Sequence, residues 1–121
     1  DKLPFDDYYR MDGREIFKFA VKKVPEVIRE ILHCSGRQAE EIDYFLLHQA
    51  NRRIIEAIAK RLGQEESKFP MNIMENGNIS SACIPILLDE LNRSHRLKPG
   101  MKLVVAGFGG GLTWGGFYME W

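Results

Sequence analysis

The fold follows most directly from residues 42–55, IDYFLLHQANRRII, where a short apolar run leads straight into a helical pattern. The run over residues 42–47 is aromatic and aliphatic, so we expect a buried strand there. From about residue 51 to 62 the apolar side chains fall on one face of a helix, and Gly63 would end that helix. A strand that leads into a helix indicates a sheet with helices packed on it.

The chain before this stretch predicts one long amphipathic helix over about residues 14–33. Its apolar residues recur at spacings of three and four. Asp12 begins a pattern that resembles a capping box, and Gly36 would close the helix. Pro25 lies inside it, and we expect this proline to kink or divide the helix. Residues 1–11 show no periodicity and predict a leading arm.

The segment after the second helix is less regular. Residues 69–74 form at best a short strand, and residues 75–78 have the composition of a turn. A third helix is expected over about residues 80–94, where Pro85 is tolerated only within the first turn.

The end of the chain predicts two strands joined by glycines. Residues 101–106 form a strong strand pattern, residues 107–111 are Gly-Phe-Gly-Gly-Gly, and residues 112–121 form a closing strand. Six of the eleven glycines lie between residues 107 and 116, so this segment needs positive φ or a close approach of backbones. The order of elements predicts the α/β class, with a mixed sheet and packed helices.

Composition limits the class of protein. A chain of 121 residues that is 45% hydrophobic and 28% charged can form one domain with a buried core. Lys and Arg total 17, as do Asp and Glu, and this balance argues against general nucleic-acid binding. No apolar run reaches the ~18 residues of a membrane span, and no signal peptide opens the chain. Cys34 and Cys83 are expected to be reduced, buried thiols, which fits a cytoplasmic protein.

Three places could hold functional groups: His48, Asn78 and the glycine loop of residues 107–111. His48 lies between a strand and a helix, a frequent position for functional side chains in α/β folds, although a single His is more often structural. Asn78 belongs to ordinary turn sequence. The glycine loop could present N–H groups to an oxyanion, or form only a tight hairpin, and it lacks the pattern of a P-loop or dinucleotide site.

Three motifs, taken together, point to a family. They are LHQANRRI at residues 47–54, GNISSA at residues 77–82 and GFGGGLTWG at residues 107–115. In this order and spacing they closely resemble the β-ketoacyl-acyl-carrier-protein synthase III family, from about Met11 to Trp121. Chalcone-synthase-like enzymes share the second motif, but the first looks like the bacterial synthase III branch.

The resemblance implies a thiolase-like fold of two similar halves, of which residues 1–121 would be the C-terminal half. It implies a cytoplasmic condensing enzyme, homodimeric and without a cofactor, that initiates fatty acid biosynthesis. Such an enzyme moves an acyl group from acyl-CoA to a Cys. Malonyl-acyl-carrier protein then loses carbon dioxide, and its carbanion attacks the acyl-Cys thioester.

The resemblance also implies catalytic roles for residues of this chain. His48 and Asn78 would donate hydrogen bonds to the malonyl thioester oxygen, which gains negative charge as carbon dioxide leaves. Gly110 would supply a backbone N–H of the oxyanion hole for attack on the acyl-Cys. Phe108 would lie beside the entrance to the reaction centre.

Four further residues match positions that contact the pantetheine arm or the carrier protein. Gly13, Phe17 and Asn51 would line the pantetheine tunnel. Arg53 would face the acidic carrier protein, where opposite charge would speed association.

The family's nucleophilic Cys belongs to the other half of the fold, and neither Cys34 nor Cys83 can replace it. Because the chain also lacks an initiator Met, we expect it to be cut from a longer protein and to be inactive alone.

The competing interpretation is a non-catalytic half-domain or subunit that binds acyl groups or carrier protein. A secondary-metabolite condensing enzyme of the same branch is also open. The face that would pack on the N-terminal half should be apolar, so the isolated chain should self-associate.

Two other kinds of site are disfavoured. Paired ligand spacing for zinc is missing from the candidate ligands, which are His33, Cys34, His48, Cys83 and His95. Residues 55–63 superficially resemble the start of a helix-turn-helix motif, but neither a recognition helix nor a basic surplus follows. We therefore expect no metal, no nucleic acid and no membrane among the partners.

Overall fold

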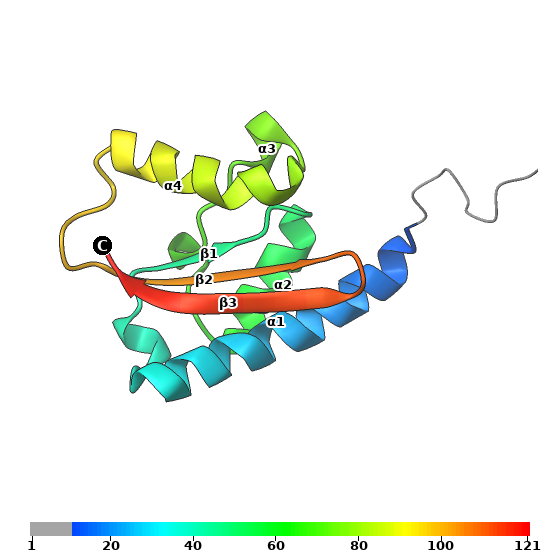
Figure 1. Cartoon of the computed structure of the whole chain (residues 1–121), viewed down its shortest axis with the longest axis horizontal. Helices are drawn as coiled ribbons and strands as arrows, with labels where there is room; N and C mark the ends of the chain where they lie inside the picture. Colours follow the sequence, from blue (N-terminus) through cyan, green and yellow to red (C-terminus); the bar gives the residue numbers. More distant parts are fainter. Residues whose placement is uncertain (1–10) are drawn as a thin grey trace, which may run out of the picture.

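Residues 11–121 are described by the computed structural model, and they form a three-stranded mixed sheet with helices on both faces (Figure 1). The strands are β1 (Tyr44–Leu47), β2 (Lys102–Gly109) and β3 (Thr113–Glu120), which lie side by side in that order. β1 pairs with β2 in parallel, and β2 pairs with β3 antiparallel. The predicted α/β class is confirmed. The predicted leading arm lies outside the described residues, apart from Met11.

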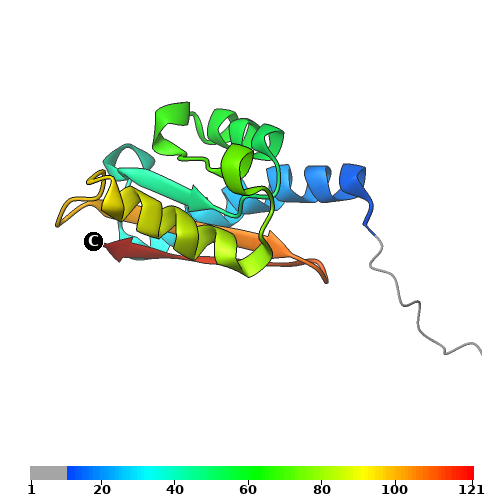
Figure 2. The same ribbon diagram turned by 90° about the horizontal axis from the view of Figure 1, so that it is seen from above.

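The sheet separates two apolar clusters, because successive side chains of a strand point to opposite faces. One face packs against helices α1 (Gly13–Ser35) and α2 (Arg52–Leu62) through Phe45, Leu47, Val104 and Ala106. The other face packs against helix α4 (Cys83–Arg93) through Leu46, Leu103 and Val105. In Figure 2, α4 lies in front of the strands and α1 lies behind them.

Of the two effects expected of Pro25, a kink or a division, the division does not occur, because α1 runs unbroken from Gly13 to Ser35. A proline has no backbone N–H, and this leaves the carbonyl of Val21, one turn earlier, without its helical partner. The guanidinium of Arg61 in α2 donates to that carbonyl at 3.3 Å, and Arg29 donates to the carbonyl of Arg61 at 2.9 Å. The neighbouring helix thus supplies the hydrogen bond that the proline removes.

The predicted ends of α1 and α2 are confirmed. The side chain of Asp12 accepts the N–H groups of Arg14 and Glu15, and Gly36 closes α1 with a φ of 64°. Gly63 closes α2 in the same way with a φ of 66°. A left-handed residue at these positions lets the last carbonyls of a helix find backbone partners.

Residues 69–74 do not form the short strand that was expected. The helical turn α3 (Ile73–Asn76) occupies part of this segment. The ring of Phe69 stacks on Phe45 of β1, with ring centroids 4.8 Å apart, so the segment packs against the sheet without pairing with it. Pro85 is the third residue of α4 and therefore lies in the first turn, as predicted.

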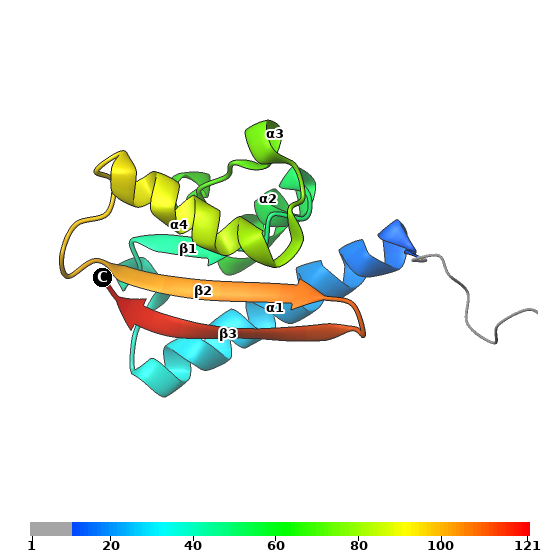
Figure 3. The same ribbon diagram turned by 45° about the horizontal axis from the view of Figure 1, so that its top comes forward.

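Strands β2 and β3 form a hairpin (Figure 3), and glycine is required at two positions of it. Gly111, in the turn between β2 and β3, has a φ of 134°, which side chains rarely tolerate. Gly116 of β3 lies so close to β2 and α1 that a Cβ would collide with the Val105 carbonyl and come within 2.8 Å of Ile31. The expected positive φ and close approach are confirmed there, whereas residues 107–109 continue β2.

Gly116→Ala should destabilise the fold, because the added methyl meets backbone that pairs β2 with β3. We expect the free energy of unfolding to fall by about 1–3 kcal/mol, the usual cost of overpacking. Gly115→Ala is the matched control, since nothing lies within 4 Å of the Cβ that it would add. Urea unfolding of both variants checks this, and equal stability of the two variants would contradict it.

Candidate active site

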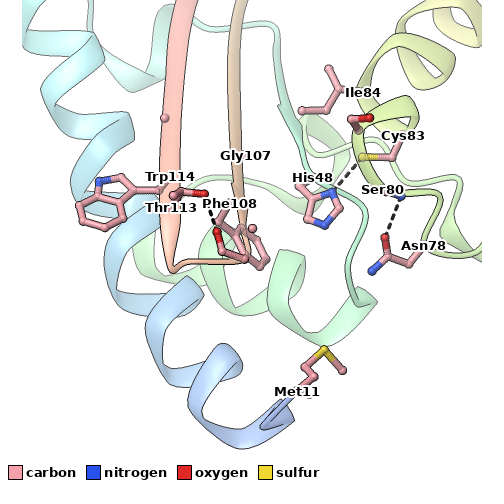
Figure 4. A pocket seen from close by; sticks show the side chains of 14 residues that line it. Met11, His48, Asn78, Ser80, Cys83, Ile84, Gly107, Phe108, Thr113 and Trp114 are labelled. Atoms are coloured by element: carbon pink, nitrogen blue, oxygen red, sulfur yellow. Dashed lines mark hydrogen bonds between the residues drawn. The ribbon is translucent and has the colours of Figure 1, made fainter. Parts of the chain in front are cut away.

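A pocket of about 700 Å³ opens at the carboxyl end of the two parallel strands. It lies between the residue that follows β1, the turn that leads into α4 and the hairpin that joins β2 to β3 (Figure 4). Open α/β sheets bind ligands at this edge, because the loops that follow the strands meet there. Its lining includes four of the residues named from the sequence: His48, Asn78, Phe108 and Gly110.

His48 enters the pocket directly from the end of β1. Its backbone N–H donates to the carbonyl of Ala106 at 3.0 Å, which continues the pairing of β1 with β2. Its ring packs edge to face on Phe108, with ring centroids 5.2 Å apart, and its Nδ1 lies 3.0 Å from Sγ of Cys83. The ring is therefore held on two sides, and its second nitrogen, Nε2, faces the pocket (Figure 4).

Asn78 enters the same pocket from the turn before α4. Its Oδ1 accepts the backbone N–H of Ser80 at 3.1 Å, which leaves the amide N–H groups directed into the pocket (Figure 4). The turn needs two unusual backbone conformations. Gly77 has a φ of 67° with a ψ of −163°, and Ser80 has a φ of 56°. Such conformations persist only where the surroundings hold them, so the turn fixes the position of Asn78.

In both His48 and Asn78 one polar atom is engaged inside the protein, while a nitrogen of the same side chain faces the pocket. Nδ1 of His48 is held by Cys83, and Oδ1 of Asn78 is held by Ser80. Among the described residues that line this pocket there is no Asp or Glu. Two donors in such a pocket can stabilise negative charge that develops on a bound oxygen.

Burial lowers the pKa of His48 below its ordinary value of about 6.5. His48 is therefore neutral at neutral pH and donates from one ring nitrogen only. The folded protein binds a proton at His48 less readily than the unfolded chain does. The part of the free energy of unfolding that depends on neutral His48 is therefore fully present above about pH 6.5, and it is lost as the pH falls toward the lowered pKa.

An NMR titration of the His48 ring protons should therefore give a midpoint below about 6.5, the value for an unperturbed histidine. His48→Gln should remove the corresponding loss of stability between neutral and acidic pH. A midpoint equal to that of the unfolded chain, or higher, would contradict this prediction.

Gly110 lies in the turn between β2 and β3, where its carbonyl accepts the hydroxyl of Thr113 at 3.0 Å. An adjoining pocket of about 360 Å³ shares His48 and Asn78 with the first and follows this turn to the beginning of α1 at Asp12. The turn therefore forms one wall of both pockets.

The residues expected along a pantetheine tunnel are not all brought together. Phe17 and Arg53 line a separate pocket of about 480 Å³ between α1 and α2. Asn51 is the N-cap of α2, and its Oδ1 accepts the N–H of Arg53 at 2.8 Å. Gly13 is the first residue of α1. Phe17 thus lies with Arg53 and does not line the pocket that contains His48.

Gln49 is a buried polar residue that the sequence analysis missed. Its side chain donates to the carbonyl of Leu47 at 2.9 Å and accepts the N–H of Asn72 at 3.2 Å, and its own N–H lies 3.4 Å from Sγ of Cys83. These bonds fix the direction in which the chain leaves β1 and so help to place His48. The sequence feature that could have pointed to this role is an amide side chain directly after His48, at the end of an apolar strand.

The two cysteines differ from the expectation that both are buried and inert, although both are free thiols. Cys34 is exposed, so its predicted burial is wrong. The buried stripe of α1 ends at Leu32, and two residues later on a helix the side chain points to the opposite side. Cys83 is buried as predicted, but it touches His48 and belongs to the site.

Residues 11–121 contain neither a cluster of metal ligands nor a helix that could span a membrane. No group of three His, Cys, Asp or Glu side chains in this part of the chain is placed to hold a metal ion. None of the helices in it is both long and apolar enough to cross a membrane.

Comparison with known proteins gives close matches. Residues 32–121 match the family described as 3-Oxoacyl-[acyl-carrier-protein (ACP)] synthase III C terminal. A beta-ketoacyl-[acyl-carrier-protein] synthase III of Clostridium acetobutylicum is 50% identical over 111 residues, which are 92% of this chain and 34% of that protein.

Solved structures agree with the sequence matches. The 3-oxoacyl-[acyl-carrier-protein] synthase III from Aquifex aeolicus VF5 is 43% identical with a TM-score of 0.92, over 94% of this chain and 37% of that one. The priming beta-ketosynthase from the R1128 polyketide biosynthetic pathway is 36% identical with a TM-score of 0.87, over 92% of this chain and 34% of that one. This chain thus spans about a third of the length of the proteins that it matches.

Proposed function

This chain belongs to the 3-oxoacyl-[acyl-carrier-protein] synthase III family, and from that premise we propose that it is the C-terminal part of an enzyme that initiates fatty acid biosynthesis. The reaction joins an acyl group from acyl-CoA to malonyl-acyl-carrier protein with loss of carbon dioxide. The observation that supports this best is that His48 and Asn78 line one pocket, each with a nitrogen that faces it. Both cysteines are free, in keeping with a cytoplasmic location.

The first half of the reaction needs a nucleophile that we place in the N-terminal half of the enzyme. A Cys thiolate attacks the acyl-CoA thioester, the bond to the CoA sulfur breaks, and CoA leaves as a thiol after taking up a proton. Cys34 does not line the pocket. Cys83 does line it, but it is 1% exposed and its sulfur lies against His48. Neither is placed to accept the acyl group.

The second half of the reaction would take place at the residues of this chain. The bond between the malonyl carboxylate and its neighbouring carbon breaks, carbon dioxide leaves, and the electron pair passes to the thioester as an enolate. Nε2–H of His48 and an Nδ2–H of Asn78 would donate to the enolate oxygen as it becomes negative.

The enolate carbon then attacks the carbonyl of the acyl-Cys thioester and forms the new carbon–carbon bond. The carbonyl oxygen becomes negative in this step, and the backbone N–H of Gly110 would stabilise it. The Cys thiolate leaves and recovers its proton, which yields a 3-oxoacyl-acyl-carrier protein. Phe108, packed on the ring of His48, would shape the entrance to this centre.

The pocket between α1 and α2 would receive the carrier protein. Arg53 is exposed there and Phe17 is half-buried. The lining also includes a second cation, Lys60, and two carboxylates, Glu56 and Glu66. We assign this pocket to the approach of the acidic carrier protein and its pantetheine arm. Gly13 and Asn51, at the first turns of the two helices, would contribute backbone to the same path.

The outer strand β3 exposes large apolar side chains that an isolated soluble domain would cover. Its exposed residues and those beside it include Leu112, Trp114, Phe117 and Trp121. We propose that the N-terminal half covers these side chains along the edge strand β3 in the complete enzyme, which would function as a homodimer. Residues 1–121 alone should therefore self-associate. Light scattering during size-exclusion chromatography measures this, and a monomer at high concentration would contradict it.

The proposed activity is tested with the full-length protein, acetyl-CoA and malonyl-acyl-carrier protein. We expect the mass of the carrier protein to change from the malonyl to the 3-oxobutyryl form, with release of carbon dioxide. Carrier protein that is bound but never condensed, with acetyl or with longer and branched acyl-CoA, would contradict the enzyme and favour the non-catalytic half-domain.

A condensing enzyme of secondary metabolism is the second candidate, because the likeness to a polyketide priming ketosynthase is also close. The acyl-CoA and carrier protein that the full-length enzyme prefers distinguish the two. Preference for a carrier protein of a polyketide pathway over that of fatty acid biosynthesis would favour the second candidate.

A further inference from the structure

Cys83 is the buried partner of the proposed catalytic histidine. It is the first residue of α4 and is 1% exposed, and its Sγ lies 3.0 Å from Nδ1 of His48. The same sulfur receives the backbone N–H of Gln49 at 3.4 Å. These two contacts place the thiol between the end of β1 and the beginning of α4.

The direction of the contact with Gln49 follows from the groups involved. The backbone N–H of Gln49 can only donate, so the sulfur of Cys83 is the acceptor in that contact. The thiol hydrogen is then available for Nδ1 of His48, which can accept it through its lone pair. A neutral imidazole carries a single N–H, so a hydrogen bond accepted at Nδ1 leaves that N–H at Nε2.

We propose that Cys83 is a positioning residue that holds His48 in the tautomer with its N–H on Nε2. In this form the donor of His48 faces the pocket that it shares with Asn78 (Figure 4). With the other tautomer the lone pair of Nε2 would face the pocket and would repel a negative oxygen. The tautomer is a property of the resting protein, whereas its effect on rate rests on the proposed function.

The tautomer can be measured directly by nitrogen NMR of the full-length protein with labelled histidine. The ring nitrogen that lacks a hydrogen resonates far downfield of the one that carries it, and a His48→Gln variant identifies the signals of His48. We expect Nε2 to carry the hydrogen in the parent protein. Cys83→Ser should preserve this pattern, because a hydroxyl also accepts from Gln49 and donates to His48.

Cys83→Ala removes the partner and should shift the His48 signals toward a mixture of tautomers. Cys34→Ala is the matched control, because it removes an exposed thiol that does not line the pocket. The proposal is overturned if Nδ1 of His48 carries the hydrogen in the parent protein, or if Cys83→Ala leaves the His48 signals unchanged. The parent and Cys83→Ser spectra decide the question even if Cys83→Ala fails to fold.

Kinetics then test the consequence for the reaction. Cys83→Ala should lower kcat for malonyl decarboxylation about 10-fold, the lower end of the effect known for losing the hydrogen-bond partner of a metal-bound histidine, with little change in KM. Cys83→Ser should restore most of the rate, because its hydroxyl can make the same hydrogen bonds. Parent protein with the Nε2 tautomer but no condensing activity would refute the proposed function and leave the role of Cys83 intact.

Discussion

His48→Ala in the full-length enzyme is expected to slow decarboxylation of malonyl-acyl-carrier protein by ~10²–10³-fold, the usual cost of removing one donor from an oxyanion site. The side chain enters the pocket from β1 with Nε2 directed inward, so its loss removes a donor without disturbing the core. Acyl transfer from acyl-CoA to the enzyme should stay largely intact, because that step would use a Cys outside this chain. Release of labelled carbon dioxide and the mass of the acyl-enzyme measure the two steps separately.

His48→Gln is the matched control for this prediction, because an amide of similar reach still offers N–H donors. It should retain more decarboxylation than His48→Ala. If both variants lost acyl transfer as severely as decarboxylation, the assigned role of His48 would be wrong.

Asn78→Asp is expected to be more damaging than Asn78→Ala, although it changes fewer atoms. The carboxylate keeps an oxygen for the N–H of Ser80, so the turn before α4 should survive. It also replaces the Nδ2 donor by an acceptor, and at neutral pH it brings a negative charge to the place where the enolate oxygen becomes negative. The loss in decarboxylation should therefore exceed the ~10²–10³-fold expected for Asn78→Ala.

The pH dependence of Asn78→Asp provides an internal check. Protonation of the new carboxyl at acidic pH removes its charge and creates an O–H donor. Decarboxylation by this variant should therefore recover in part as the pH falls, while Asn78→Ala should show no such recovery. An Asp variant that is faster than the Ala variant at neutral pH would contradict a donor role for Asn78.

Local signals in the sequence predicted most of the helices and strands. Apolar periodicity and the capping residues Asp12, Gly36 and Gly63 placed α1 and α2 within a residue or two. Pro25 shows where such signals fail. The local rule predicts a kink or a division, but the helix is not divided, and the carbonyl that the proline leaves without a partner accepts a hydrogen bond from Arg61 of another helix. A local pattern contains no information about such a partner.

The site was predicted by its motifs rather than by its contacts. The three motifs singled out His48, Asn78 and Gly110, and these residues line one pocket, while their roles stay predictions. The contact between His48 and Cys83 was missed because it joins two elements, β1 and α4, that are far apart in the chain. Burial of Cys83 could be predicted from its apolar neighbours, but its neighbour in space could not.

The most direct measurement is to locate the acyl group after the full-length protein has reacted with acyl-CoA alone. Digestion and peptide mass spectrometry identify the modified residue. We predict that the acyl group lies on a cysteine outside residues 1–121, with Cys34 and Cys83 unmodified. An acyl group on Cys83 would contradict the proposal that the nucleophile lies outside residues 1–121 and that His48 acts as a donor, because Cys83 would then be the nucleophile and His48 its base.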